Sequence, residues 1–158
     1  MKTLIVRPAQ ASDSARILSM RNEPRTRAMS LTTDVVTQDQ HEAWFAKTLA
    51  SSSRKLYVAA LPAAPDAIMG VCRFDIAQSG DEAEISINLA EAAQGQGLSP
   101  ILITSCVSLF QVHNPAIRTI LARVRHENVA SQKSFLRAGF QQDASPVEAG
   151  CLWYRLEI

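Results

Sequence analysis

Glu84-Ile85-Ser86-Ile87-Asn88-Leu89, followed at a short distance by Gln94-Gly95-Gln96-Gly97-Leu98-Ser99, is the stretch that decides how we interpret this chain. The first segment alternates polar and apolar residues at period two, which predicts a strand with one buried face. Its other face would carry Glu84, Ser86 and Asn88. Residues 101–112 then show apolar residues at helical density until Asn114-Pro115 ends the pattern. We therefore expect a strand, a tight glycine loop and a helix in direct succession.

The glycine loop suits an anion. Glycines leave backbone N–H groups unobstructed, and the start of the following helix adds the positive end of its dipole. A Walker loop is excluded because Leu98 and Ser99, not lysine, follow Gly97. The dinucleotide fingerprint is excluded because Pro100 stands where a third small residue is required. A simple turn remains the alternative, since a short glycine motif is weak evidence by itself.

The remaining elements are predicted from periodicity, caps and turns. We expect strands at residues 4–7, 55–61, 67–76, 117–124 and 152–158, and helices from Ser12-Asp13 to near Pro24, from Thr37, and over 128–138. A polar connection should separate the first two helices. Thr37 and Gln40 have capping-box spacing, and the second helix should carry on or near its buried side Ala43, Trp44, Phe45, Thr48 and Leu49. The order β-α-α-β-β-β-α-β-α-β predicts an α+β fold with helices on the faces of a mixed sheet.

Length and composition limit the class of protein. The 158 residues fit one domain over residues 1–158, and 16 basic against 15 acidic residues give no field that would attract nucleic acid or a membrane. Cys72, Cys106 and Cys151 lack metal-ligand spacing, so we expect free thiols and a reducing compartment. His113 and His126 have no partner at ligand spacing, so no metal site is expected. Without a long apolar run, the expected location is cytoplasmic.

Two motifs together resemble the GCN5-related N-acetyltransferase (GNAT) superfamily. Its cofactor motif, Gln/Arg-x-x-Gly-x-Gly/Ala, is similar to Gln94, Gly97 and Ser99. Its later signature, Asn, a small residue and Tyr before Gly-Phe, resembles Asn128, Ser131, Phe135 and Gly139-Phe140. The stretch from Arg21-Asn22 to His41-x-x-Trp44 further resembles the branch that holds ribosomal-protein alanine acetyltransferases and amino-sugar nucleotide acetyltransferases.

The resemblance implies both a fold and a cofactor. The fold is a GNAT-like α+β fold with a mixed, mainly antiparallel sheet of six to seven strands, splayed between the fourth and fifth strands, and about four helices on its two faces. The cofactor is acetyl-CoA, lying in the opening between the Leu89 strand and the strand at 117–124. Its pyrophosphate would be held by Gln94, Gly95, Gln96, Gly97, Leu98 and Ser99, and its pantetheine would pair with the Leu89 backbone. Asn128, Ser131 and Phe135 would lie on its far side.

Acyl transfer sets requirements that particular residues can meet. Attack on a thioester produces an oxyanion, and the Leu89 N–H is the donor that we expect to stabilise it. An alkyl ammonium, of pKa about 10.4, must first lose a proton, and Glu84 is the candidate base, with Ser86 and Asn88 orienting the amine or a water molecule. A purely structural polar sheet face is the alternative.

Phe135 departs from the family pattern. The family often has a tyrosine there, which protonates the departing thiolate. We expect another group or solvent to supply this proton, because a thiol of pKa about 8.5 is a fair leaving group.

Acceptor-binding residues are expected in the N-terminal third of the chain. Arg21, Arg25 and Arg27 suit a phosphate or a carboxylate, with a solvated basic face as the alternative. His41 and Trp44 share a helix face and would contact the amine substrate. His41 would accept its proton, and Trp44 would form an apolar wall beside it. Core packing is the alternative for Trp44. The expected substrate-binding residues are Arg21, Asn22, His41 and Trp44.

Three functions follow from these patterns. The first is an N-acetyltransferase that moves an acetyl group from acetyl-CoA to a small-molecule or peptide amine by direct attack. A nucleotide-linked amino sugar and a protein N-terminal amine are the leading acceptors, with amino acids, polyamines and antibiotics as alternatives. The second is a non-catalytic acyl-CoA-binding module, because of Phe135. The third is a nucleotide-phosphate binder of another α/β family. A homodimer is compatible with each of them.

Overall fold

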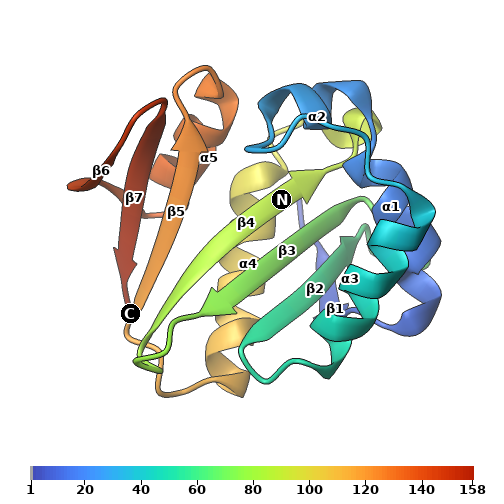
Figure 1. Ribbon diagram of the computed structural model, residues 1–158, viewed down its shortest axis with the longest axis horizontal. Coiled ribbons are helices and arrows are strands. Elements are labelled where there is room, and N and C mark those ends of the chain that lie inside the picture. The colour runs from blue at the N-terminus through green and yellow to red at the C-terminus, as the bar shows by residue number, and fades with distance from the viewer. Residues whose placement is uncertain (1) are drawn as a thin grey trace.

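Seven strands and five α-helices make up the part of the chain that the structure describes (Figure 1). It is a computed structural model that describes residues 2–158, with the backbone only for residues 145–147. The strands are β1 Ile5–Pro8, β2 Arg54–Ala60, β3 Gly70–Ile76, β4 Glu82–Leu89, β5 Thr119–Arg125, β6 Gln141–Glu148 and β7 Cys151–Glu157. The helices are α1 Ser14–Arg21, α2 Pro24–Met29, α3 Gln38–Ala50, α4 Ser99–His113 and α5 Val129–Arg137, with short 3-10 turns η1 Ala11–Asp13 and η2 Glu91–Ala93.

The strands form one sheet that opens between β4 and β5. The strand order is β1-β2-β3-β4-β5-β7-β6, and each neighbouring pair is antiparallel except β4 with β5, which is parallel. That parallel pairing joins only residues 82–85 to residues 119–122. Beyond them the two strands diverge toward their C-terminal ends (Figure 1). This opening, which we call the wedge, confirms the splayed, mainly antiparallel α+β sheet that the resemblance implies.

Helices cover the two faces of the sheet differently. Phe110 of α4 stacks on Phe74 of β3 with ring centroids 4.0 Å apart, which anchors α4 to one face. On the opposite face, α1 and α3 pack on β2 and β3 through a second apolar cluster that includes Ile17, Met20, Phe45, Leu56, Val58 and Val71. The apolar residues of β4, Ala83, Ile85 and Leu89, belong to the α4 side.

Alternation along the strands then places a set of polar side chains opposite α4. We call this region the polar face, and it is formed by Glu84, Ser86 and Asn88 of β4 with Arg73 and Asp75 of β3. Arg73 is the cross-strand neighbour of Ser86, and Asp75 is the neighbour of Glu84.

The six strands expected from the sequence are all present, with ends that differ by a few residues. The seventh strand, β6, has no predictive signal, because Gln141–Glu148 lacks alternating apolar residues; it forms by pairing with β7. The predicted capping box of α3 is confirmed: Thr37 Oγ1 accepts a hydrogen bond from Gln40 N, and Gln40 Oε1 accepts one from Thr37 N.

Two expectations about the helices are wrong. The connection after Pro24 contains a helix, α2, which begins at this proline because a missing N–H is tolerated in the first helical turn. On α3, Ala43 and Leu49 are exposed, and the buried positions are His41, Phe45 and Thr48.

The cysteines are free thiols, as expected. Cys72 and Cys106 are buried in the core, and burial raises the pKa of the Cys72 thiol. Among residues 2–158, no helix has the length and apolar character needed to cross a membrane.

Candidate functional site

The loop at residues 94–99 is an open cradle in front of α4. Gly95 and Gly97 have φ values of +74° and +72°, a region that side chains other than glycine rarely adopt. An added Cβ at either glycine would have no heavy atom within 4 Å, so the outer side of the loop is open space. Helix α4 starts at Ser99 with Pro100 in its first turn, where the missing N–H of proline is tolerated. The loop therefore presents its backbone beside the positive end of the helix dipole.

Side chains hold the loop in shape from behind. Leu98 is buried in the core, and Gln94 Nε2 donates to Leu89 O at 2.9 Å. Gln96 Nε2 donates to Ala92 O at 2.9 Å. The side-chain amides of these two glutamines are thus occupied within the loop, and Gln94 N donates to Glu91 O. The groups left to meet an anion are the backbone N–H groups of residues 95–99 and the ammonium of Lys2, which donates to Gln96 O.

The backbone of Leu89 faces the wedge. Ala90 N donates to Met69 O at 2.8 Å, which fixes the hydrogen-bonding alternation between β3 and β4. By that alternation the Gly70–Leu89 pair is a non-hydrogen-bonded pair, so the N–H and C=O of Leu89 point away from β3. They point to the side from which β5 has separated. The Ile87 N–H points the same way, and Leu89 N–H as the oxyanion donor stays a prediction with suitable placement.

Helix α5 begins on the other side of the wedge. Asn128 is its N-cap, and Asn128 Oδ1 accepts a hydrogen bond from Ser131 N at 3.2 Å. Because β4 and β5 are parallel, their C-terminal ends lie at one edge of the sheet. The glycine loop, the Leu89 backbone and the start of α5 therefore meet around the wedge, as expected for a cofactor site. The contacts of Asn128 and Ser131 with a cofactor remain predictions.

Phe135 is part of the core beneath α5. Its side chain is 2% exposed, makes an edge-to-face contact with Phe140 at 5.1 Å between centroids, and stacks on Tyr154 at 6.4 Å. Phenylalanine carries no hydroxyl, so a proton for a departing thiolate does not come from this position.

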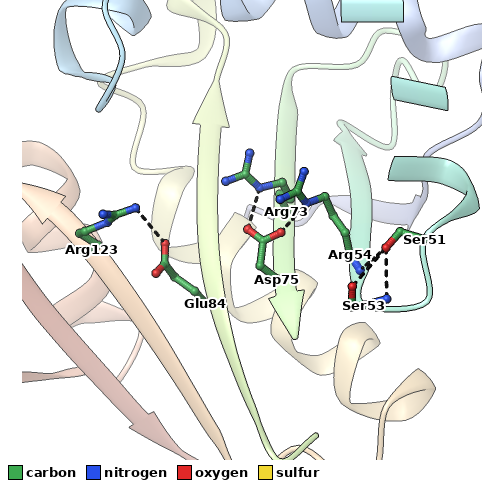
Figure 2. A network of polar contacts seen from close by, with 7 residues as sticks. All are labelled: Ser51, Ser53, Arg54, Arg73, Asp75, Glu84 and Arg123. Atoms are coloured by element: carbon green, nitrogen blue, oxygen red, sulfur yellow. Dashed lines mark hydrogen bonds and ion pairs between the residues drawn. The ribbon is translucent and has the colours of Figure 1, made fainter. Parts of the chain in front are cut away.

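Glu84 lies on the polar face between opposite charges (Figure 2). Its carboxylate is 3.7 Å from Arg123 Nη2, and Asp75 is its cross-strand neighbour. Burial raises the pKa of Glu84, the positive charge of Arg123 opposes this rise, and the negative charge of Asp75 adds to it. A carboxylate with a raised pKa is a stronger base, which suits the role predicted for it.

Glu84 is distant from the Leu89 N–H along β4. Five residues of strand span about 16 Å. If the reacting carbonyl lies at Leu89, the Glu84 carboxylate acts through water or through Ser86 and Asn88, which lie between them on the same face.

Sequence reasoning missed Arg73 and Asp75 of the polar face, and it missed Arg123 and Trp153 beside this face. Arg73 Nε donates to Asp75 Oδ2 at 3.0 Å (Figure 2). Arg123 Nη1 lies 3.1 Å from Glu148 Oε1. The Arg123 guanidinium lies over the Trp153 ring, 5.6 Å from its centroid. Alternation within β3 and β5 carried the signal for both arginines, because their apolar neighbours point to the α4 side.

Helix α2 is pinned to the end of β4 by paired hydrogen bonds. Glu23 Oε2 accepts from Glu91 N at 2.6 Å, and Glu91 Oε1 accepts from Arg25 N at 2.9 Å. Thr26 Oγ1 also donates to Asn88 Oδ1 at 3.2 Å. Asn88 is therefore in contact with α2 at the edge of the wedge.

The same segment is held from the β5 side. Arg125 Nη1 donates to Ala28 O and to Ser30 O, both at 3.1 Å. Helix α2 and the turn after it thus connect the separated ends of β4 and β5. We call this connection the α2 bridge.

Arg21 and Asn22 hold the connection that leads to α3. The Asn22 amide makes two bonds with Val36, Nδ2 to Val36 O at 2.8 Å and Val36 N to Oδ1 at 2.9 Å. Arg21 Nη2 donates to Thr32 O at 2.9 Å, whereas Arg21 Nη1 is buried without a partner. Both residues have structural contacts, and their predicted substrate contacts remain predictions.

His41 and Trp44 lie where α1 and α3 pack together. His41 is 3% exposed, its Nε2 is 3.0 Å from Ser14 Oγ, and its ring stacks on Phe45. Burial lowers the pKa of His41. Trp44 is half-buried against the same cluster. Core packing accounts for these contacts, and the predicted substrate roles of both residues remain untested.

A hollow of about 270 Å³ opens away from the wedge, between the end of α3 and the adjoining ends of β2 and β3. None of the site residues predicted from the sequence lines it.

A family model described as an acetyltransferase (GNAT) domain matches residues 3–141. The fold is similar to that of spermidine N-acetyltransferase from Vibrio cholerae in complex with CoA and spermine, with a TM-score of 0.83, 18% identity, and coverage of 99% of this chain and 95% of that one. It is also similar to aminoglycoside acetyltransferase AAC(6')-Ib in complex with coenzyme A, with a TM-score of 0.80, 19% identity, and coverage of 98% and 95%. The GNAT domain of S. lividans PAT gives a TM-score of 0.78 at 20% identity, with coverage of 97% and 89%. Compared by sequence, no curated protein is similar enough to count as a match.

Proposed function

Because the chain belongs to the GNAT acetyltransferase family, we propose that it is an enzyme that transfers an acetyl group from acetyl-CoA to a primary amine by direct attack. The observation that carries the proposal is the wedge. An open glycine cradle, a helix N-terminus and the outward-pointing N–H of Leu89 meet at one end of it, and a polar face with Glu84 flanks it.

The residues at the wedge fit acetyl-CoA, which is the cofactor of this family. The backbone of residues 94–99 would hold the pyrophosphate, the Leu89 backbone would pair with the pantetheine, and Asn128 and Ser131 would contact its far side. Bound there, acetyl-CoA supplies an activated acetyl thioester. The Leu89 N–H would donate a hydrogen bond to the thioester oxygen as negative charge develops on it.

The polar face would prepare the amine. Glu84, whose pKa is raised, accepts the proton of the ammonium through water ordered by Ser86 and Asn88. Phe135 has no proton to give, so solvent protonates the thiolate, which is a fair leaving group without help. Positioning of the two substrates provides much of the remaining acceleration.

A non-catalytic acyl-CoA-binding module is the second candidate, and Phe135 is the observation that favours it. Two measurements separate the candidates. Protection of the wild-type protein by acetyl-CoA against thermal unfolding is expected from both, since a ligand that binds only the folded state stabilises it. Release of free thiol from acetyl-CoA on addition of an amine is expected only from the enzyme. No protection by acetyl-CoA would reject both.

A further inference from the structure

Several buried N–H donors around the polar face have no acceptor among the described residues. Within the part of the chain that the structure describes, four buried side-chain atoms have no hydrogen-bond partner: Arg21 Nη1, Thr48 Oγ1, Arg123 Nε and Trp153 Nε1. Arg123 and Trp153 are cross-strand neighbours beside Glu84. Three of the four atoms are thus N–H donors around one face. Buried donors are normally satisfied, so a ligand that brings acceptors is the simplest complement.

Two guanidinium groups meet at the turn after α2: Arg21 Nη2 donates to Thr32 O at 2.9 Å, and Arg27 Nη1 donates to Thr33 O at 3.5 Å. The guanidinium group of Arg73 approaches them from β3. Burial lowers the pKa of Arg21, and the positive charges of Arg27 and Arg73 lower it further. We call Arg21, Arg27 and Arg73 the arginine cluster. Within residues 2–158, neither Arg21 nor Arg27 forms an ion pair, and their hydrogen bonds go to backbone carbonyls. Arg73 is paired with Asp75, but Asp75 also pairs with Arg54 (Figure 2). The positive charge of the cluster is therefore only partly neutralised by the protein.

The arginine cluster adjoins the place where the amine is expected. Arg73 is the cross-strand neighbour of Ser86, which lies between Glu84 and Asn88 on β4. Arg27 is on α2, and that helix contacts Asn88 through Thr26. Arg21 is the last residue of α1, immediately before α2. An acceptor whose amine lies over Ser86 and Asn88 would have its remaining groups within reach of these side chains.

We propose that the acceptor is an amine that also carries a carboxylate or a phosphate, and that the arginine cluster binds this anionic group. This inference rests on the proposed function. Guanidinium groups match carboxylate and phosphate oxygens with paired hydrogen bonds, and an anion would complete the neutralisation of Arg21 and Arg27. Polyamines and other polycations would be repelled. Nearby positive charge also favours the neutral form of the amine, which is the form that attacks.

The test compares amines that differ only in the anionic group. Thiol release from acetyl-CoA is measured for L-alanine against L-alaninamide, for glucosamine 6-phosphate against glucosamine, and for spermidine. We expect at least one anionic amine to exceed its neutral counterpart in kcat/KM by about 10- to 100-fold, the range of one or two charge-assisted hydrogen bonds. The pair that responds identifies carboxylate or phosphate as the group that is bound.

Variants attribute the preference to the cluster. Arg21→Gln and Arg27→Gln should each reduce the ratio of kcat/KM for the anionic amine to that for its neutral counterpart by about 10-fold or more, while leaving the KM for acetyl-CoA unchanged. Arg118→Gln is the matched control, because Arg118 is exposed and its side chain makes no ion pair among the described residues. Protection by acetyl-CoA against thermal unfolding shows that each variant is folded. Equal rates within both pairs, preference for spermidine, or a preference that survives both substitutions would overturn the proposal.

The two proposals fail in different ways. If no amine releases thiol, the proposed function fails, and the cluster is tested by binding alone. In the presence of CoA, L-alanine or glucosamine 6-phosphate should raise the Tm of the wild-type protein more than its neutral counterpart does, and Arg21→Gln should abolish the difference. No such difference in the wild-type protein would reject an anion site at the cluster.

Discussion

The two sides of the wedge are built from different parts of the polypeptide. On the cofactor side, the groups proposed to bind acetyl-CoA belong mostly to the backbone: the N–H groups of residues 95–99, the start of α4 and the Leu89 N–H. On the acceptor side they are side chains on β3, β4, β5 and the α1–α2 segment. A backbone site is encoded by a contiguous motif, whereas a side-chain site depends on how several elements come together. The cofactor side can therefore be common to a family while the acceptor side differs among its members.

Glu84→Gln would remove the predicted base from the acceptor side. General-base catalysis contributes about 10²- to 10⁴-fold, so kcat should fall within that range while protection by acetyl-CoA stays unchanged. In the wild-type protein, activity should decline as the pH falls through the raised pKa of Glu84, because the protonated carboxyl accepts no proton. Steady-state rates from pH 5 to pH 8 check both points. Unchanged turnover in the variant would remove Glu84 from the mechanism.

Gly97→Ala would damage the cofactor side. Alanine is strained at a φ of +72°, and its Cβ would point into the open cradle. We expect the Kd for acetyl-CoA to rise on the order of 100-fold, measured by calorimetry.

Gly80→Ala is a matched control for Gly97→Ala. Gly80 has a φ of +82°, an added Cβ there would also meet nothing within 4 Å, and it lies in the turn between β3 and β4. Both variants should lose a similar amount of stability, about 1–2 kcal/mol, but Gly80→Ala should keep its affinity for acetyl-CoA. Equal loss of affinity in the two variants would contradict a pyrophosphate site at the loop.

Arg125→Gln would loosen the α2 bridge, which connects the two sides. It removes the guanidinium that holds Ala28 O and Ser30 O. Hydrogen bonds of this kind are worth about 1–3 kcal/mol, so the acceptor KM should rise by roughly 5- to 150-fold. A small effect on the KM for acetyl-CoA is expected. A larger rise in the KM for acetyl-CoA than in the KM for the acceptor would instead place the α2 bridge on the cofactor side.

His41→Phe should have the smallest effect on activity, because His41 is packed between α1 and α3. Burial lowers the pKa of His41 below the ordinary 6.5, so this imidazole is protonated at a higher pH in the unfolded chain than in the folded protein. This contribution to stability is complete above pH 6.5 and is lost as the pH falls below it. Denaturant unfolding should show that the free energy of unfolding drops less between pH 7 and pH 5 for the variant than for the wild-type protein. A large loss of acetyl transfer would instead support the substrate role predicted from the sequence.

The difference between the two sides also explains what could be predicted from the sequence. The sequence carries local signals for several elements: alternation along β4, the glycines at 95 and 97, and the helical pattern over 128–138. The elements that these signals predict are present. Strand β6 and helix α2 have no such signal, because pairing with β7 and contacts with Glu91 and Arg125 stabilise them.

The residues of the acceptor side could not be predicted from the sequence for the same reason. Arg73 and Arg123 are ordinary strand residues until the sheet places them beside Arg21 and Glu84. Asn22 and His41, chosen from a resemblance, have their polar atoms engaged with Val36 and Ser14.

The central claim is that the wedge joins acetyl-CoA and an amine for direct transfer, and the transfer itself can be measured. The wild-type protein is incubated with acetyl-CoA labelled in the acetyl carbon and with the amines of the panel, and free thiol and labelled amide are quantified together. We predict equal amounts of the two products with at least one amine, and neither product when the amine is left out. Binding of acetyl-CoA without label in any amine would contradict the claim and leave a binding module in its place.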